Sequence, residues 1–282
     1  MEEKILPFYK KINIFTKASK EAKDFAVKIK NWLNLHGIES NITDNLADLE
    51  HEEFLKDIDF LIVVGGDGSL LISARRVAKY EIPIIGINLG RLGFLTEINE
   101  DEAFDKLKQI LSKPLCISKR MMLRATLYRE GKKILEADVL NDVVVNKAIL
   151  ARIVDVAVYV GDRYITTYNG DGIIISTPNG STGYALSAGG PIVYPMMEVL
   201  LVVPICPHTL TDRPIVLPTL EPITIKLVAK EKDAWLTLDG QEGTQLMYND
   251  EIVVKKSPYY AHLIRTPYKN YFDILREKLN WK

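Results

Sequence analysis

The residues best suited to chemistry form a short glycine-rich segment, Gly65-Gly66-Asp67-Gly68-Ser69. Glycine lets the backbone approach a ligand closely, and the N–H groups at the start of a following helix favour phosphate. A carboxylate repels phosphate, so Asp67 indicates a second task, namely contacting a hydroxyl nucleophile, a Mg²⁺ ion or both. The structural alternative is a tight turn in which Asp67 caps the helix. The spacing fits neither a P-loop nor a GxGxxG motif.

Two further segments combine glycine with polar or aromatic side chains. Residues 86–95 read GINLGRLGFL, and Phe94 could stack on a flat ring or simply join the core. Residues 169–191 are dominated by small, hydroxylated and glycine residues and contain an apolar run of three isoleucines at 173–175. A segment with so many donors and so little bulk can wrap a polar ligand with N–H and hydroxyl groups. The alternative is a solvated loop.

The elements that must position these segments alternate in the first part of the chain. Apolar runs at 11–15, 59–64 and 82–87 predict strands, and the apolar spacing at 19–35 and 69–79 predicts helices. Strand, helix and strand at this spacing indicate an open, Rossmann-like α/β sheet. The glycine-rich segments at 65–69 and 86–95 lie at the ends of neighbouring strands, which is where such sheets bind ligands.

The second part of the chain has a different pattern. Short strand-like runs separated by turn signals extend from Leu123 to Arg265, and a last amphipathic helix covers 271–279. We therefore expect an α/β domain at 1–118 and a β-rich, sandwich-like domain at 119–266.

Composition excludes several classes of protein. The 282 residues include 36 Lys and Arg against 37 Asp and Glu, a formal net charge of -1, which excludes a globally basic nucleic-acid-binding protein. The apolar runs are too short to span a membrane, and no N-terminal apolar segment indicates secretion. Cys116 and Cys206 form no metal-binding pattern. We expect a cytoplasmic protein with no nucleic-acid or membrane partner.

Six segments together resemble the ATP-dependent NAD kinases. They read GGDGS, NLGRLGFLTE, LNDVVV, NGDGIIISTPNGSTGYALSAGGPIV, PICPHTLTDRPIVLP and LDGQ, in this order, between about 59 and 241. GGDG alone is shared with lipid kinases and phosphofructokinases, whereas the fourth and fifth segments favour the NAD kinases. The resemblance implies that the β-rich domain wraps the dinucleotide and that a C-terminal helix at 267–282 packs on the α/β domain.

The resemblance also implies roles for individual residues. It makes Asp67 the catalytic base that faces the 2′-hydroxyl of the adenosine ribose. The residues assigned to NAD⁺ binding are Gly68, Phe94, Asn141, Asp142, Arg152, Asn169, Asp171, Thr182, Gly183, Tyr184, Ser187 and Gln241. Those assigned to the phosphates of ATP are Gly65, Gly66 and Ser69.

Four positions depart from the pattern of the NAD kinases. Asp142 is one methylene shorter than the usual glutamate, and Asn169 stands where many relatives carry arginine. Asn179 and Gly183 replace the commoner threonine and alanine. A glycine at 183 adds freedom to a loop that binds through its backbone.

The implied reaction is in-line transfer of the ATP γ-phosphoryl group to the 2′-hydroxyl of NAD⁺. In a loose transition state the proton leaves late, so Asp67 orients the nucleophile and accepts that proton. Mg²⁺ or another divalent cation would arrive with ATP, with Asp67 as a further contact and no metal site of clustered protein ligands. A homodimer or homotetramer is expected from relatives. The alternatives are a GGDG-type kinase of a lipid or sugar phosphate and a non-catalytic dinucleotide sensor.

Overall fold

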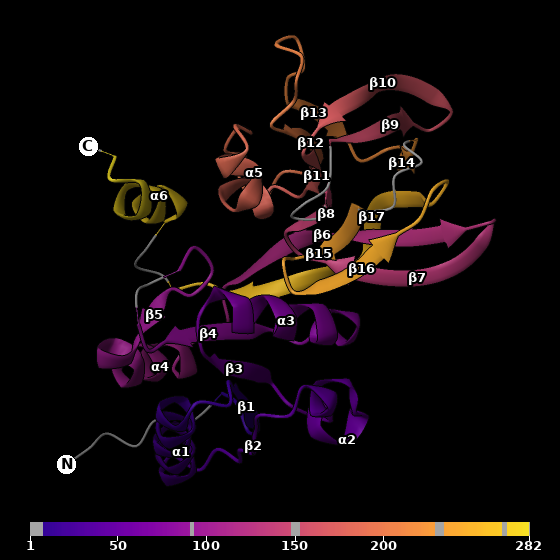
Figure 1. Ribbon diagram of the computed structural model, residues 1–282. Helices are drawn as coiled ribbons and strands as arrows, with labels where there is room; N and C mark the ends of the chain where they lie inside the picture. Colours follow the sequence, from indigo (N-terminus) through magenta and orange to yellow (C-terminus); the bar gives the residue numbers. More distant parts are fainter. Residues whose placement is uncertain (1–7, 91–92, 148–152, 229–233, 267–269, 282) are drawn as a thin grey trace. The chain divides into compact units, whose positions relative to one another are not determined.

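The computed structural model describes residues 8–90, 93–147, 153–228, 234–266 and 270–281. The chain divides into two compact units (Figure 1). Unit 1 contains Met1–Lys119 and Ala261–Lys282, and unit 2 contains Arg120–Tyr260. The chain thus returns to unit 1 at Ala261, whereas the β-rich domain was expected to extend to 266.

Unit 1 is built on a parallel sheet. Its strands are β1 (Ile12–Thr16), β2 (Ile42–Thr43), β3 (Phe60–Val64), β4 (Ile84–Asn88) and β5 (Ile98–Asn99). The order β4-β3-β1-β2 is parallel throughout, with β5 beside the end of β4 and Leu263 of β17 (Glu251–Ile264) beside its start. Every residue of β1 and β3 is buried, as expected for strands covered on both faces.

The helices of unit 1 lie between these strands along the chain, except for the last helix, which follows β17. They are α1 (Lys20–Leu35), α2 (Glu52–Leu55), α3 (Asp67–Val77), α4 (Ala103–Leu111) and α6 (Tyr271–Leu279), with single turns η1 (Leu46–Glu50), η2 (Ala78–Tyr80) and η3 (Glu100–Glu102). Ser19 caps α1 by accepting the N–H of Ala22. The apolar face of α1 packs on β1 and β3. The crossover helices thus bury the sheet that presents the Gly65–Ser69 segment.

Unit 2 contains two groups of antiparallel strands. One sheet has the order β13-β12-β11-β8-β15-β16 and comprises β8 (Asp142–Lys147), β11 (Gly172–Ser176), β12 (Val199–Ile205), β13 (Ile215–Pro218), β15 (Ala234–Leu238) and β16 (Glu242–Leu246). The other group has the order β10-β9-β14-β17 and the hairpin β6–β7, comprising β6 (Ile117–Arg129), β7 (Lys132–Val139), β9 (Val154–Val160), β10 (Arg163–Gly170) and β14 (Ile223–Leu227).

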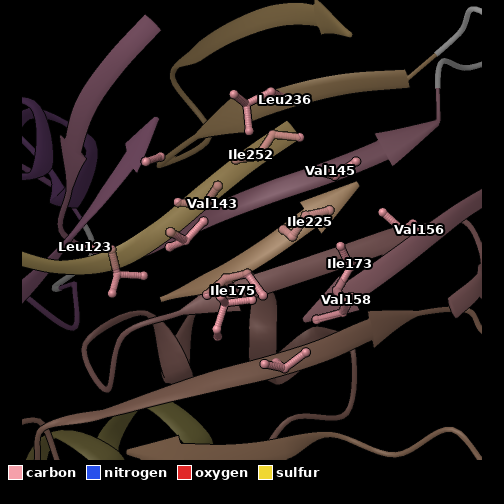
Figure 2. Close-up of a cluster of buried hydrophobic side chains, with 14 of the residues drawn as sticks. Leu123, Val143, Val145, Val156, Val158, Ile173, Ile175, Ile225, Leu236 and Ile252 are labelled. Atoms are coloured by element: carbon pink, nitrogen blue, oxygen red, sulfur yellow. The ribbon is translucent and has the colours of Figure 1, made fainter. Parts of the chain in front are cut away.

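Side chains from both groups of strands form one apolar core in unit 2. Figure 2 shows ten of them at its centre: Leu123, Val143, Val145, Val156, Val158, Ile173, Ile175, Ile225, Leu236 and Ile252. The β-branched residues that dominate this set suit pleated, buried surfaces. In the described part of unit 2, helical structure is limited to η4 (Gly180–Thr182) and α5 (Tyr184–Ser187). The predicted fold class, an α/β domain followed by a sheet-rich domain, is confirmed.

Among the residues that the structure describes, no helix is long and apolar enough to cross a bilayer.

Candidate functional site

The glycine turn between β3 and α3 is tighter than the sequence predicts. The helix begins at Asp67 and not at 69, with Gly66 as the N-cap residue. A Cβ atom at Gly65 would lie 2.4 Å from Ser69 Oγ, so the chain requires glycine there to enter α3 directly. The N–H groups of Gly65 and Ser69 donate to the carbonyls of Ile87 and Gly66 at 2.9 and 3.0 Å. These two amides are therefore engaged within the fold, which leaves Ser69 its hydroxyl for a phosphate.

Asp67 does not cap its helix but holds a second loop. Its Oδ2 accepts the N–H of Phe94 at 2.7 Å. Its Oδ1 accepts the N–H of Leu95 at 3.2 Å, the N–H of Thr96 at 3.1 Å and the hydroxyl of Thr96 at 3.1 Å. The interpretation of Asp67 as a capping residue is therefore wrong. Oδ1 takes three of these four bonds and each carboxylate oxygen has two lone pairs, so Oδ2 can accept another hydrogen bond.

Gly93 makes this contact possible. A Cβ atom at Gly93 would lie 1.7 Å from Asp67 Oδ1, and its N–H donates to Thr96 Oγ1 at 3.0 Å. The glycine-rich loop after β4 is thus shaped by the carboxylate that it surrounds. Phe94 is half-buried beside it. Arg91 and Leu92, in the same loop, lie outside the described residues.

In unit 2, a cavity of 310 Å³ brings together three of the residues predicted to bind NAD⁺. They are Asn141, Asp142 and Tyr184, and the remaining lining comes from Val144, Asn146, Thr237, Asp239 and Gly240. Tyr184, at the start of α5, is 44% exposed. Burial, followed by the nearby Cys206, Asp171 and Asp142, raises the pKa of the Tyr184 phenol. The phenol therefore stays protonated at neutral pH and can donate a hydrogen bond into the cavity.

Asp142 has the most perturbed carboxyl group of this cavity. It begins β8 and is 5% exposed. Burial, and secondarily the charge of Asp239, raises the pKa of Asp142 to about 7. Strong perturbation of a carboxyl group in a cleft is typical of binding and catalytic sites.

Asp239 is a residue of this cavity to which the sequence assigns no role. Its Oδ2 accepts the N–H of Leu140 at 2.9 Å, and its Oδ1 accepts those of Asn141 at 2.7 Å and Asp142 at 3.0 Å. Asp239 lies in the LDGQ segment, where Asp-Gly indicates a turn. That turn was the only sequence signal for it, since the residues that it contacts are about a hundred positions away along the chain.

Two buried polar side chains, linked by hydrogen bonds, orient the side chain of Asn141. Asn179 Nδ2 donates to Asn141 Oδ1 at 2.8 Å, and Arg120 Nη1 donates to Asn179 Oδ1 at 3.4 Å. Arg120 and Asn179 are 6% and 8% exposed. With its oxygen held in this way, the Asn141 amide presents its NH₂ group to the cavity.

The hydroxyl-rich segment uses most of its hydroxyl groups to fold itself. Ser176 Oγ donates to the carbonyl of Asn141 at 3.1 Å and Thr177 Oγ1 to that of Leu140 at 2.6 Å. Ser181 Oγ donates to the carbonyl of Pro178 at 2.7 Å. A Cβ atom at Gly180 would lie 2.4 Å from the Asn141 carbonyl, so glycine is required for this approach. The hydroxyls thus fix the loop against the Leu140–Asn141 backbone and do not simply line a ligand site.

The other predicted NAD⁺-binding residues in unit 2 do not line this cavity, among the residues that the structure describes. Asn169 in β10 donates its Nδ2 to Asp155 in β9. Asp171 forms an ion pair with Lys147 at 2.7 Å. The rest are Thr182, Gly183, Ser187 and Gln241, of which Ser187 and Gln241 are exposed. Arg152 lies outside the described residues.

Unit 1 also contains a larger, open depression of 680 Å³. Its lining includes Phe25, Lys28, Asn88 and Phe104, but neither Asp67 nor Phe94. We therefore place the candidate chemistry of this unit at Asp67 and not in this depression. Within the described residues, no group of three or more His, Cys, Asp or Glu side chains could hold a metal ion.

Two family models match the chain. The model of the ATP-NAD kinase N-terminal domain matches residues 15–114, and that of the ATP-NAD kinase C-terminal domain matches residues 140–266. The first match contains Asp67 and the second contains the cavity formed by Asn141, Asp142 and Tyr184.

Curated proteins and solved structures agree with these matches. The NAD kinase of Geobacter metallireducens is 46% identical over 96% of this chain and 99% of its own length, and that of Geotalea daltonii is 43% identical over the same shares. An NAD kinase from Archaeoglobus fulgidus in complex with ATP has a TM-score of 0.74 at 26% identity, over 96% of this chain and 97% of its own. Yeast NADH kinase complexed with NADH has the same fold, with a TM-score of 0.86 at 23% identity over 98% and 89% of the two chains. The chain therefore belongs to the NAD kinase family.

Proposed function

We propose that this protein transfers the γ-phosphoryl group of ATP to the 2′-hydroxyl of the adenosine ribose of NAD⁺, giving NADP⁺ and ADP. The observation that carries the proposal is the geometry of Asp67 in a chain of the NAD kinase family. Its carboxylate lies in the first turn of α3, is fixed by four hydrogen bonds and keeps an acceptor position on Oδ2. A fixed acceptor at a helix start suits a hydroxyl group that attacks a phosphate.

In the proposed reaction the 2′-oxygen forms a bond to the γ-phosphorus while the bond from that phosphorus to the bridging oxygen of ADP breaks. The 2′-hydroxyl proton passes to Asp67 Oδ2 late in the transfer. Phe94, whose backbone Asp67 holds, would contact the adenine. The Ser69 hydroxyl and the glycine turn would contact the phosphates of ATP.

In unit 2, we propose that Asn141 and Asp142 hold hydroxyl or amide groups of NAD⁺ in the 310 Å³ cavity, with Tyr184 at its edge. The oriented NH₂ group of Asn141 and the carboxyl group of Asp142 offer a donor beside an acceptor, which matches a ribose diol. Gly68, Asn169, Asp171, Thr182, Gly183, Ser187, Gln241 and Arg152 remain predicted contacts.

The proposal includes a divalent cation carried by ATP. Asp67 is a single carboxylate whose oxygens already accept four hydrogen bonds, so the donor set suits an ion held mainly by phosphate oxygens, with Asp67 as an outer contact. Mg²⁺ neutralises charge on the transferred phosphoryl group. We also propose that the protein is cytoplasmic and forms a homodimer or homotetramer. The exposed Met196 and Met197 could contribute contact surface between subunits. Light scattering coupled to size-exclusion chromatography would measure the number of subunits.

An assay for NADP⁺ formed from NAD⁺, ATP and Mg²⁺ tests the proposed function. NADP⁺ should accumulate in proportion to the protein and should disappear when Mg²⁺ is chelated. Failure to form NADP⁺ with either ATP or polyphosphate would refute the proposal. Binding of NAD⁺ without turnover would then identify a sensor, and turnover of a lipid or sugar phosphate would identify a different kinase.

A further inference from the structure

The carboxylate of Asp239 binds three consecutive backbone N–H groups of the turn at Leu140–Asp142, which lies at the proposed NAD⁺ cavity. Asp239 follows β15 with φ +50°, and the next residue, Gly240, has φ +66°. This left-handed pair directs the Asp239 side chain back over the start of β8. Asp239 is 7% exposed, and its backbone N–H donates to the Asp142 carbonyl at 3.0 Å.

Three consecutive N–H groups converge on this carboxylate. They belong to Leu140, Asn141 and Asp142, and their distances to the Asp239 oxygens are 2.9, 2.7 and 3.0 Å. Three convergent backbone donors form a small anion-binding nest and stabilise the ionised form of the carboxylate that they bind. These bonds therefore fix the conformation of the turn between β7 and β8. That conformation sets the positions from which the side chains of Asn141 and Asp142 extend.

We propose that Asp239 is a positioning residue of the NAD⁺ site: it fixes the Leu140–Asp142 turn and, by its charge, controls how Asp142 accepts hydrogen bonds from the dinucleotide. This inference rests on the proposed function, since it takes the cavity of unit 2 to bind NAD⁺. Asp239 acts through Asn141 and Asp142, not by touching the reacting atoms.

The electrostatic part of the inference depends on the groups that face Asp142. In the described part of the chain, these are the carboxylate of Asp239 at the end of β15 and the phenol of Tyr184 in α5. Ser176, opposite Asp142 in β11, is neutral. Lys147 and Asp171 form an ion pair at the other end of β8.

The direction of the pH effect follows from these groups. Burial and the Asp239 charge raise the pKa of Asp142 to about 7. The ionised carboxylate only accepts hydrogen bonds, whereas protonation turns one of its oxygens into an O–H donor and weakens acceptance. NAD⁺ should therefore bind more weakly as the pH falls through 7, and removing the Asp239 charge should lower the pH at which binding weakens.

The variant Asp239→Asn tests both effects. The amide can accept the bonds of Asn141 and Asp142, but its NH₂ group then faces the N–H of Leu140. We expect the Kd for NAD⁺ to rise about ten- to a hundredfold at pH 8, with kcat changed less than about threefold, because the lost interaction is a binding one. The pH midpoint of Kd should move downward. Kd is measured by titration without ATP, because terminal phosphates titrate near pH 6.

Asp250 provides a matched control in the same unit. It is fully buried, accepts the N–H of Met247 at 2.8 Å and binds Arg129 at 2.8 Å. Asp250→Asn should reduce thermal stability but leave the pH midpoint of NAD⁺ binding unchanged. An equal shift of the midpoint in both variants would mean that general loosening of the sheet explains the effect, and would overturn the inference.

Asp142→Asn keeps the inference testable if the Asp239 variant does not fold. This variant lacks the titrating group, so its Kd for NAD⁺ should be independent of pH between 6 and 8. An unchanged pH dependence in Asp142→Asn, or a wild-type midpoint in folded Asp239→Asn, would overturn the inference while wild-type NADP⁺ formation still supported the function. A wild-type protein that forms no NADP⁺ would instead refute the proposed function.

Discussion

Asp67 in unit 1 and Asp239 in unit 2 perform the same structural task with different exposure. Each carboxylate gathers three consecutive backbone N–H groups from a loop that is distant in sequence: Phe94–Thr96 for Asp67 and Leu140–Asp142 for Asp239. Asp67 is half-buried, whereas Asp239 is 7% exposed. The first keeps an acceptor position that can meet a substrate, while the second is engaged with the turn that carries Asn141 and Asp142.

This difference separates a catalytic carboxylate from a positioning one. Asp67 stands in the first turn of an 11-residue helix, where the helix dipole stabilises its negative charge, and Oδ2 keeps an acceptor position. Asp239 holds the backbone N–H groups of Leu140, Asn141 and Asp142, and its charge adds to the effect of burial in raising the pKa of Asp142. The two sites can be separated by variants that affect turnover in one case and NAD⁺ affinity in the other.

The largest effect is expected for Asp67→Asn. Loss of the proton acceptor should reduce kcat about 10²- to 10⁴-fold. If Asp67 acted only as the proton acceptor, NAD⁺ affinity would stay nearly intact. An amide, however, cannot accept all four hydrogen bonds of the Phe94–Thr96 loop, so the KM for NAD⁺ should also rise. Steady-state kinetics with varied NAD⁺ measure both, and near-normal turnover would refute the role of Asp67 as the base.

Gly93→Ala should have the next largest effect. Its Cβ atom would lie 1.7 Å from Asp67 Oδ1, so the carboxylate or the loop must move, and kcat/KM should fall about 10²-fold, as misplacement of a reacting group does. Gly90→Ala is the matched control in the same loop, because among the described residues its Cβ atom would meet only Asn88 Oδ1, at 3.9 Å. Equal losses in the two variants would show that loop flexibility matters and not the fit around Asp67.

Asp142→Asn should stabilise the protein at high pH. The pKa of Asp142 is raised from 3.8 in the unfolded chain to about 7 in the folded protein. The folded state therefore loses stability as the pH rises from about 4 to 7, and above pH 7 the loss is on the order of 4 kcal/mol. A buried amide also loses hydration, so we expect a net gain on the order of 2 kcal/mol. Urea unfolding at pH 5 and 8 measures it. The gain should be larger at pH 8, and a gain equal at both pH values would contradict the raised pKa.

The smallest effect is expected for Asn179→Thr. Threonine cannot span the distance between Arg120 and Asn141, so Asn141 loses one neutral hydrogen bond of about 0.5 to 1.5 kcal/mol. The KM for NAD⁺ should rise about two- to tenfold. The same substitution made in an Asn141→Ala background should have little further effect. An undiminished effect in that background would place the role of Asn179 elsewhere.

Elements with a local signal were predictable from the sequence. The apolar periodicity predicts α1, the buried runs predict β3 and β4, and the last amphipathic segment predicts α6. β17 runs from Glu251 through Pro258 to Ile264, but the strand-like run in its sequence covers only 252–255. Its polar residues and proline weaken the strand pattern, and pairing with its neighbours overrides it.

The identities of the site residues were more predictable than their partners. The Gly65–Ser69 segment and LDGQ mark Asp67 and the Asp239 turn, but the loop that each carboxylate holds depends on which strands are neighbours. Asp67 reaches Phe94 because β3 pairs with β4, and Asp239 reaches Leu140 because β15 pairs with β8. Sequence patterns also do not show whether hydroxyls such as Thr177 and Ser181 face a ligand or their own backbone.

Single-turnover phosphorylation of NAD⁺ at saturating NAD⁺ and ATP, with wild-type protein, Asp67→Asn and Asp239→Asn, tests the division of roles between the two carboxylates most directly. Saturation removes differences in binding, so the measured rate reports the chemical step. We expect Asp67→Asn to be slower than the wild type by at least about 100-fold and Asp239→Asn to remain within about threefold of it. Equal slowing of the two variants, or a wild-type rate for Asp67→Asn, would contradict the account.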